Sequence, residues 1–362
     1  MTCNNVSAAR IGLLRNLTHC WRIYGEDIEM SKVRVGRRIC HGGAERGRDG
    51  GATDTLLSQT REWTPSLVGS SDRLRGLLDR LSSMSVEDYY NPYRIFEWPD
   101  RLPNGMWWMT PSLMTVHETE VAKELSTEQL QAVSKYESIN FYSLNVHGIR
   151  ELLIEVVERI HTAEFAEASE FFHHFIGEEN EHMWFFAKFC LRYGPKIYRQ
   201  PRGGAEAVPP NNAESLLVFA RILIFEELVD HFNSKMALDA ELHDTIRQIN
   251  RIHHQDESRH IAFGRELVGL LFDGFREQAS DEDLAQVNDY IKRYLVFSFE
   301  SLFNPRVYRD AGLEDPLGVR SRLLADPRQS EFQQQVFRKT LAFLTRIGMI
   351  GDRDLSTVGS AS

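Results

Sequence analysis

Residues 253–260 read His-His-Gln-Asp-Glu-Ser-Arg-His and lie within a long stretch of helical periodicity. At 3.6 residues per turn, His253, Glu257 and His260 stand at i, i+4 and i+7, one above another on a single helix face. The same face continues through Ile246, which turns it toward the protein interior. A buried carboxylate beside two buried imidazoles is costly unless something compensates it, and a divalent metal ion does so most effectively.

A second pair of ligand-type residues lies upstream, where Glu179 and His182 are spaced at i and i+3 among several phenylalanines. In a four-helix bundle that holds two metal ions, two helices each supply a Glu-x-x-His pair and the other two each supply one glutamate. Glu226 follows four apolar residues and shares their face, so it is the candidate on a third helix, with Glu227 as its less buried neighbour. The sequence therefore predicts a dimetal site between four helices.

The remaining helix leaves alternatives open. Periodicity does not choose among Glu151, Glu155 and Glu158, because none of them stands squarely on the apolar face of that helix. Two further Glu-x-x-His pairs, at 158–161 and 170–173, repeat the ligand spacing. Short motifs of this kind arise by chance, and we do not expect either pair to bind metal.

Carboxylate and imidazole ligands without thiolate favour iron or manganese over a structural zinc. A histidine that binds a metal usually donates its other N–H to a carboxylate. Asp256 and Glu178 each immediately precede a predicted ligand. We therefore expect Asp256 to orient His182 and Glu178 to orient His260 across two helices, and Arg259 to point elsewhere on its helix.

Helical periodicity dominates the chain from about residue 71, without convincing strand alternation. Ser126 followed by Gln129 forms a capping box that opens the first long helix. Long helices joined by short links predict an all-α, ferritin-like four-helix bundle with additional flanking helices, as one domain over 71–355. The expected helical runs cover 126–161, 162–193, 213–238, 239–272, 280–303 and 329–350.

Composition limits the alternatives for the chain as a whole. The 362 residues carry a formal net charge of −10, which argues against a phosphate-binding protein and against a nucleic-acid partner. The most apolar stretch, 216–225, is too short to span a bilayer, and Gly- and Arg-rich residues 1–70 predict a flexible, disordered segment. A cytoplasmic location is the default, because four scattered cysteines offer neither a disulfide framework nor a thiolate zinc site: Cys3, Cys20, Cys40 and Cys190.

These motifs resemble the p-aminobenzoate N-oxygenase family, the non-haem diiron arylamine oxygenases of antibiotic biosynthesis. The resemblance rests on the His-x-x-x-Glu-x-x-His spacing at 253–260, on the upstream Glu-x-x-His pair and on the core glutamate, and it spans about 129–271. Residues 150–154, Arg-Glu-Leu-Leu-Ile, resemble the family's first-helix ligand motif and select Glu151. The resemblance implies seven metal ligands: Glu151, Glu179, His182, Glu226, His253, Glu257 and His260.

The family resemblance also implies a reaction and partners. It implies two iron ions, with manganese as the other metal to consider, O2 as co-substrate and an external electron donor. The expected substrate is a small amine, free or attached to a carrier protein, which is oxidised through hydroxylamine and nitroso stages to a nitro group by a homodimer. Aromatic side chains could line its pocket, although at least half of them are expected to be structural: Phe141, Tyr142, Phe172, Phe175 and Phe225.

Three other interpretations compete with amine oxidation. One is a C–H hydroxylase, desaturase or halogenase on the same scaffold; a halogenase needs a vacant ligand position for halide, and seven predicted ligands leave none. Another is a ferroxidase or iron-storage bundle, whose chains are typically shorter and lack the third histidine. The last is a helical interaction protein without metal, in which buried glutamates and histidines pair with one another.

Overall fold

The computed structural model describes residues 72–199 and 213–355. They belong to one of two compact units of the chain, residues 61–362, and the predicted flexible segment 1–70 lies outside the described residues. Within the described ranges the chain forms helices and no β-strand, apart from an isolated bridge between Trp107 and Leu242. The predicted all-α class is therefore confirmed.

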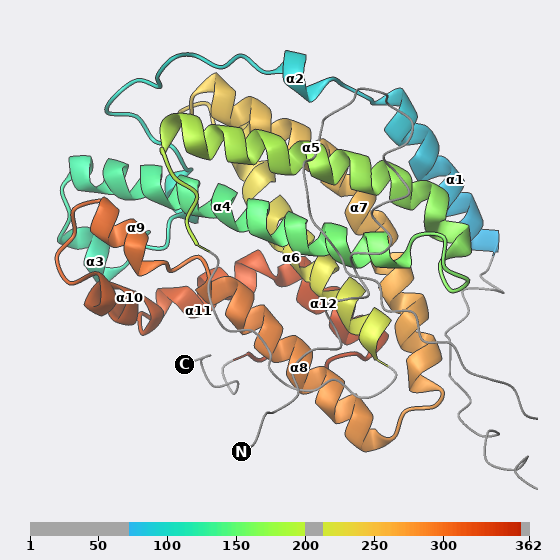
Figure 1. The fold of residues 1–362 in the computed structure, drawn as a ribbon. Coiled ribbons are helices and arrows are strands. Elements are labelled where there is room, and N and C mark those ends of the chain that lie inside the picture. Colours follow the sequence, from blue (N-terminus) through green and yellow to red (C-terminus); the bar gives the residue numbers. More distant parts are fainter. Residues whose placement is uncertain (1–71, 200–212, 356–362) are drawn as a thin grey trace, which may run out of the picture. The chain divides into compact units, whose positions relative to one another are not determined.

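Four long helices form the body of this unit. They are α4 (Thr127–Arg159), α5 (Ser169–Tyr193), α6 (Glu214–Leu238) and α7 (Asp244–Arg276). Figure 1 shows them side by side, with α4 packed chiefly on α5 and α6 chiefly on α7. This arrangement is the ferritin-like four-helix bundle that the sequence predicts.

Local sequence explains where two of the helices begin. The Ser126 side chain accepts a hydrogen bond from the backbone N–H of Gln129, whose own side chain caps Ser126 in return, so the predicted capping box is confirmed. Ser280 and Asp283 open α8 (Asp281–Glu300) with the same device. Each box satisfies two backbone donors that a helix start leaves without partners.

Two predicted helices differ from the structure. The second run begins at Ser169 rather than at residue 162, because His161 has a positive φ of 59° and a turn with the short 3-10 helix η2 (Ala166–Ala168) follows. The last run, predicted as one helix over 329–350, is divided at Phe337 into two.

Shorter helices flank the bundle. In Figure 1, α1 lies along α5 and α7, while α8 and α12 pack on α6. The connector that contains α2 runs along the bundle above α5. The flanking elements are α1 (Asp72–Glu87), α2 (Pro92–Ile95), η1 (Pro111–Leu113), α3 (Glu120–Lys123), α9 (Pro305–Asp310), α10 (Pro316–Leu324), α11 (Arg328–Val336) and α12 (Arg338–Ile347).

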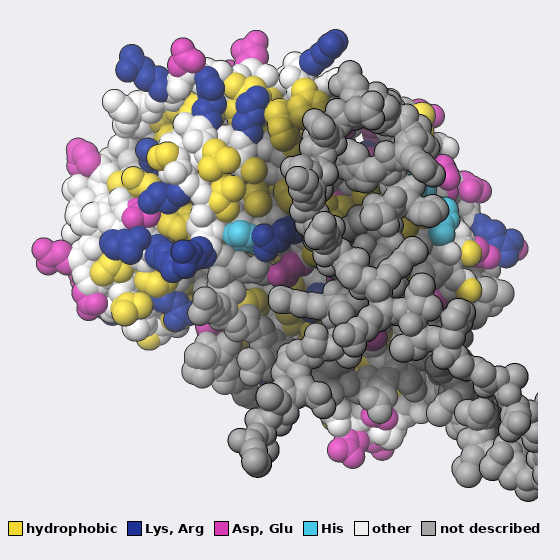
Figure 2. Space-filling view, in the orientation of Figure 1, with side chains coloured by type: hydrophobic (Ala, Val, Ile, Leu, Met, Phe, Trp, Pro, Cys, Tyr) yellow, Lys and Arg dark blue, Asp and Glu magenta, His cyan; other side chains and the backbone are white. Residues whose placement is uncertain are grey.

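The interior of the bundle is mostly aromatic and aliphatic, whereas the face seen in Figure 2 mixes apolar, basic and acidic side chains. None of the helices described here is sufficiently long and apolar to cross a bilayer. Ionisable side chains interrupt this apolar interior on the middle turns of α5, α6 and α7, where six of them are each at most 2% exposed: Glu179, His182, Glu226, His253, Glu257 and His260. Three adjacent helices thus bury several ligand-type side chains.

Candidate metal centre

Six ligand-type residues from α5, α6 and α7 meet in the bundle interior. They form two groups of four, and within each group the ligand atoms lie within 4.8 Å of one another. Glu179 and Glu257 belong to both groups. His182 and His253 complete the first group, and Glu226 and His260 complete the second: two adjacent positions that share two carboxylates.

Several atoms that face this space lack a hydrogen-bond partner although they are fully buried. They are Glu226 Oε1, His253 Nε2, Glu257 Oε2 and His260 Nδ1. A buried polar atom without a partner costs free energy that native proteins normally avoid. Carboxylate and imidazole atoms that converge in a buried space fit metal ions, so the residues present suit a dimetal site.

Two of the histidines are held by carboxylates outside the groups. His182 Nε2 lies 2.9 Å from Asp256 Oδ2, which leaves Nδ1 turned toward Glu179 at 3.3 Å. His260 Nε2 lies 2.8 Å from Glu178 Oε2, which leaves Nδ1 toward Glu179 at 2.9 Å. Both hydrogen bonds expected across α5 and α7 are therefore present. Each fixes the ring so that its second nitrogen faces the shared space.

The third histidine is held differently. His253 Nδ1 bonds to the Asn233 side chain of α6, and its Nε2 faces Glu257 Oε1 at 2.9 Å. The sequence analysis missed Asn233, which is fully buried and lies seven residues beyond Glu226 on the same helix. That i, i+7 spacing is the signal that could have found it.

Arg259 points inward, whereas the sequence predicted that it would point elsewhere on its helix. It is 2% exposed, and its guanidinium pairs with Asp256 at 2.5 Å and with Glu178 at 2.9 Å. Tyr90, from the connector after α1, donates a hydrogen bond to Asp256 at 2.9 Å. Arg259 thus links the two carboxylates that orient the histidines. Its spacing of three residues from Asp256 is visible within α7, but its contact with Glu178 of α5 is not.

Burial and charge shift the titration of the group. Burial alone would lower the pKa of His182, but Glu179 and Asp256 raise it to about 10. Burial and then the charge of Glu257 raise the pKa of Glu226 well above its usual range. Burial opposes ionisation of Asp256, yet the His182 imidazole and other cations lower its pKa to about 2. The carboxylates therefore hold protons on their neighbours, and metal ions would displace those protons.

The first-helix candidates do not join the group. Glu151 is exposed on α4, and its charge acts on Tyr294 of α8. Glu155 pairs with Arg159 at 2.8 Å and with Arg221 at 3.4 Å. The prediction that α4 supplies Glu151 to the same cluster is therefore not met: that position faces away from the bundle interior.

Contacts around Asn145 show which face of α4 turns to the group. One turn earlier, Tyr142 stacks on Phe186 with ring centroids 5.1 Å apart, and Asn250 donates to its hydroxyl at 2.7 Å. Phe186 packs in turn against the imidazole of His253 at 4.8 Å. The ring of Phe186 therefore contacts both Tyr142 and His253.

The next turn of α4 reaches the level of the second group. A side chain at Gly148 would collide with the ring of Phe225, the residue before Glu226. Asn145 and Ile149 share the buried face with Tyr142, at spacings of three and seven residues. Asn145 is thus a polar residue on the buried face of α4, about one turn after Tyr142.

The Asn145 side chain is fully buried and half satisfied. Its Nδ2 donates to the carbonyl oxygen of Phe141 at 2.9 Å, and its Oδ1 has no hydrogen-bond partner. α4 also buries one carboxylate, Glu137, which accepts hydrogen bonds from the Thr115 backbone at 3.1 and 3.3 Å, away from either group. A polar residue on an otherwise apolar face was the available sequence signal for Asn145.

A small apolar cavity adjoins the group. Its volume is about 10 Å³, and Glu226 and His260 form its polar wall. Of the aromatic residues proposed to line a pocket, Phe172 and Phe175 do so, whereas Phe141 and Tyr142 stack within the core. The remaining lining residues are Val156, Phe219, Ile222, Phe263 and Gly264.

Glu226 and Glu227 are both buried, but they face opposite sides of α6. Glu226 joins the second group, whereas Glu227 pairs with Arg265 at 2.6 Å and accepts a hydrogen bond from Thr340 at 2.5 Å. The prediction that Glu227 is less buried holds only narrowly, since the two residues are 6% and 2% exposed. The two side chains differ more in the direction they face than in how deeply they are buried.

Comparison with known families adds one finding. A family model described as p-aminobenzoate N-oxygenase AurF matches residues 72–348. The matched range contains all six clustered residues and Asn145. No curated protein matches the chain.

Proposed function

The chain belongs to the p-aminobenzoate N-oxygenase family, and we propose that it is a diiron oxygenase that transfers an oxygen atom from O2 to the nitrogen of a small amine. One observation carries the proposal: six buried glutamate and histidine side chains form two adjacent groups that share two carboxylates. In a helical bundle such an arrangement is the usual setting of a carboxylate-bridged diiron centre.

The ligand assignment follows from the two groups. Glu179 and Glu257 would contribute to holding both irons, His182 and His253 would complete one position, and Glu226 and His260 would complete the other. Three carboxylates and three neutral imidazoles offset only part of the charge of two iron ions. When bound, the diiron centre would supply the activation of O2, with two electrons from an external donor.

The rest of the chain would position ligands and exclude water. Asp256 and Glu178 hold His182 and His260 in the orientation that leaves Nδ1 for the metal, and Arg259 fixes both carboxylates. The ring of Phe175 covers His260, with ring centroids 4.4 Å apart. A dry, apolar wall protects a reactive site from side reactions with solvent.

The first oxidation step balances as a monooxygenation. An amine, one O2, two electrons and two protons give a hydroxylamine and one water: one oxygen atom forms the N–O bond and the other is reduced. The cavity of about 10 Å³ has room for roughly one water-sized molecule. Binding of an aromatic amine therefore requires Phe172, Phe175 and their neighbours to move apart.

The test is reconstitution with ferrous iron, followed by turnover of aryl and alkyl amines under 18O2 with a chemical reductant. We expect about two irons per chain, the number this ligand set implies, and an amine product that gains the mass of one 18O. Iron-loaded protein that consumes O2 without oxygenating any amine would refute N-oxygenation. Protein that binds no iron would refute the centre itself.

A second reaction gains support from α4. The sequence argument against a halogenase was that seven ligands leave no vacant position, but Glu151 lies outside the group and α4 presents the uncharged Asn145 instead. A coordination position without a carboxylate could accept halide. Turnover of the same substrates with and without chloride or bromide separates the two reactions, because only halogenation gives a halide-dependent product mass.

A further inference from the structure

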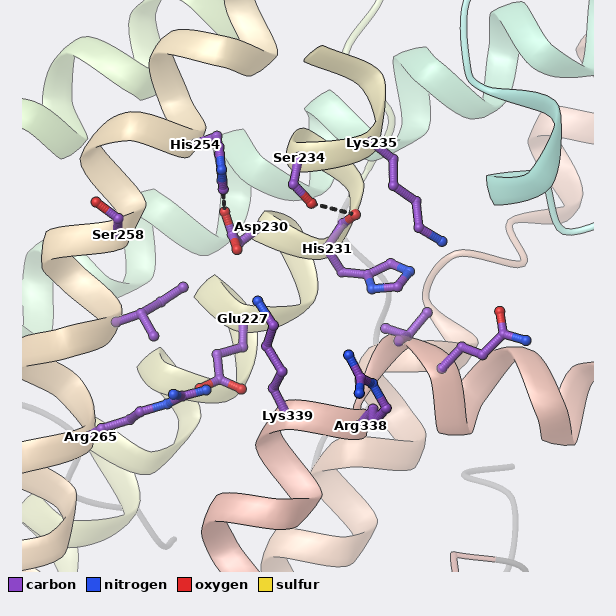
Figure 3. A pocket seen from close by; sticks show the side chains of 13 residues that line it. Glu227, Asp230, His231, Ser234, Lys235, His254, Ser258, Arg265, Arg338 and Lys339 are labelled. Atoms are coloured by element: carbon purple, nitrogen blue, oxygen red, sulfur yellow. Dashed lines mark hydrogen bonds and ion pairs between the residues drawn. The ribbon is translucent and has the colours of Figure 1, made fainter. Parts of the chain in front are cut away.

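A second cavity lies on the opposite side of the helix pair α6 and α7, under the junction of α11 and α12. Its volume is about 560 Å³, which is in the range of small-molecule sites. Side chains of α6, α7 and α12 point into the same space in Figure 3. Glu227 belongs to its wall, whereas Glu226, the next residue toward the N-terminus, faces the candidate metal centre.

The two carboxylates of this cavity are already paired. Glu227 is bound by Arg265 at 2.6 Å and by the hydroxyl of Thr340 at 2.5 Å. Asp230 bonds to Nδ1 of His254. Neither carboxylate forms an ion pair with any other cation of the cavity wall.

Three other cations line the cavity without such a partner. Lys235 of α6 and Arg338 and Lys339 of α12 make no ion pair with a carboxylate in the described part of the chain. In Figure 3 Arg338 lies beneath the ring of His231, whereas Lys339 extends toward Glu227. The whole chain carries a formal net charge of −10, so a local excess of positive charge here runs against its overall balance.

His231 reports the resulting field. Burial, and then the positive charges of Lys235, Lys339 and Arg338, lower the pKa of His231 to about 4. Its Nε2 is buried and has no hydrogen-bond partner. A neutral imidazole with a free ring nitrogen, surrounded by cations, is poised to donate a hydrogen bond to an anion.

The start of α12 adds backbone donors to the same wall. The helix has ten residues, and its N-cap, Phe337, provides no side-chain hydrogen bond. The first N–H groups of a helix lack intrahelical partners and carry the positive end of its dipole. Arg338 and Lys339, which line the cavity, belong to this first turn.

We propose that this cavity binds an organic phosphate, with Lys235, Arg338 and Lys339 contacting the phosphate group. Three unpaired cations, a free imidazole nitrogen and an uncapped helix start suit a dianion with several acceptor oxygens better than a monoanionic carboxylate. The volume exceeds that of a bare phosphate, so the ligand carries an organic part that can rest against Ile261 and Val336. The site is separate from the candidate metal centre and does not depend on the proposed reaction.

The experiment measures binding of phenyl phosphate to the full-length chain by isothermal titration calorimetry at low ionic strength, with benzoate and inorganic phosphate as comparison probes. We expect saturable binding of phenyl phosphate that is tighter than that of benzoate and weakens with salt. Absence of saturable binding at millimolar probe, or tighter binding of benzoate, would overturn the proposal.

Two double variants test the location. R338Q/K339Q removes two cations of the cavity and should raise the dissociation constant by roughly tenfold or more, since a charge-assisted hydrogen bond is lost at each position. The matched control R94Q/R306Q removes two exposed cations that do not line the cavity and should leave binding unchanged within about twofold. Equal losses in the two variants would show a non-specific charge effect and overturn the assignment. All four positions are exposed, and circular dichroism verifies that both variants fold.

Discussion

The sequence predicts correctly which residues α7 contributes to the cluster, but the ligand that it predicts on α4 lies outside the cluster. On α7, His253, Glu257 and His260 lie in the cluster with the spacing that the sequence indicates. On α4, the predicted Glu151 is exposed, and Asn145 lies on the buried face instead. A motif within one helix fixes its own face, whereas the residue that a neighbouring helix contributes depends on how the two helices pack.

The largest expected effect tests the α7 side. Glu257→Gln removes a carboxylate that both groups share, so we expect iron content to fall from about two per chain to less than one. Glu151→Gln on α4 is the matched control and should retain wild-type iron. Metal analysis after reconstitution provides the measurement. Equal iron content in the two variants would contradict the claim that Glu257 of α7 binds the metal and Glu151 of α4 does not.

A smaller effect is expected one step outside the ligands. Asp256→Asn weakens the acceptor that holds His182, and loss of such an outer contact typically lowers metal affinity about 10–100-fold. Competition with a coloured chelator gives the affinity. Asp273→Asn is the control, because this exposed residue pairs with Arg276 at 2.7 Å near the end of α7. Unchanged affinity in Asp256→Asn would assign that residue a purely structural role.

The carboxylate that α4 does bury allows a test of stability. Burial raises the pKa of Glu137 from its usual range to about 7, so the folded state holds a proton that the unfolded state releases. The stabilisation is complete below the unfolded pKa and is lost as pH rises through the folded one. Between pH 5.5 and 8 the wild type should lose about 2 kcal/mol of unfolding free energy relative to Glu137→Gln. Urea unfolding of both proteins at the two pH values measures this difference, and parallel profiles would contradict it.

The smallest effect concerns Asn145. If its free Oδ1 faces the metal pair, Asn145→Ala should lower iron affinity by about tenfold or less, while both irons still bind at saturation. The chelator competition used for Asp256 measures the change, and Mössbauer spectra of the iron-loaded variant should show altered parameters at one iron. Spectra and affinity identical to those of wild type would place Asn145 outside the coordination sphere.

Much of the molecule could be predicted without coordinates. The capping boxes at Ser126 and Ser280 and the long periodic runs determine where α4 and α8 begin, because these are local interactions. The spacing of ligand-type residues within α5 and α7 determines which of their side chains share a face. Chemistry alone then pointed to Asp256 and Glu178 as partners of the histidines, and both hydrogen bonds are present.

Tertiary packing decided the rest. Arg259 turns inward because Asp256 and Glu178 from two helices compensate its charge, and a single-helix view cannot supply both. Tyr90 reaches Asp256 from a segment 166 residues away. Asn145 rather than Glu151 lies on the buried face of α4, where Tyr142 stacks on Phe186 and the ring of Phe225 fills the space beside Gly148. Periodicity fixes positions around one helix axis, but the angle between two helices comes only from side chains that interlock across them.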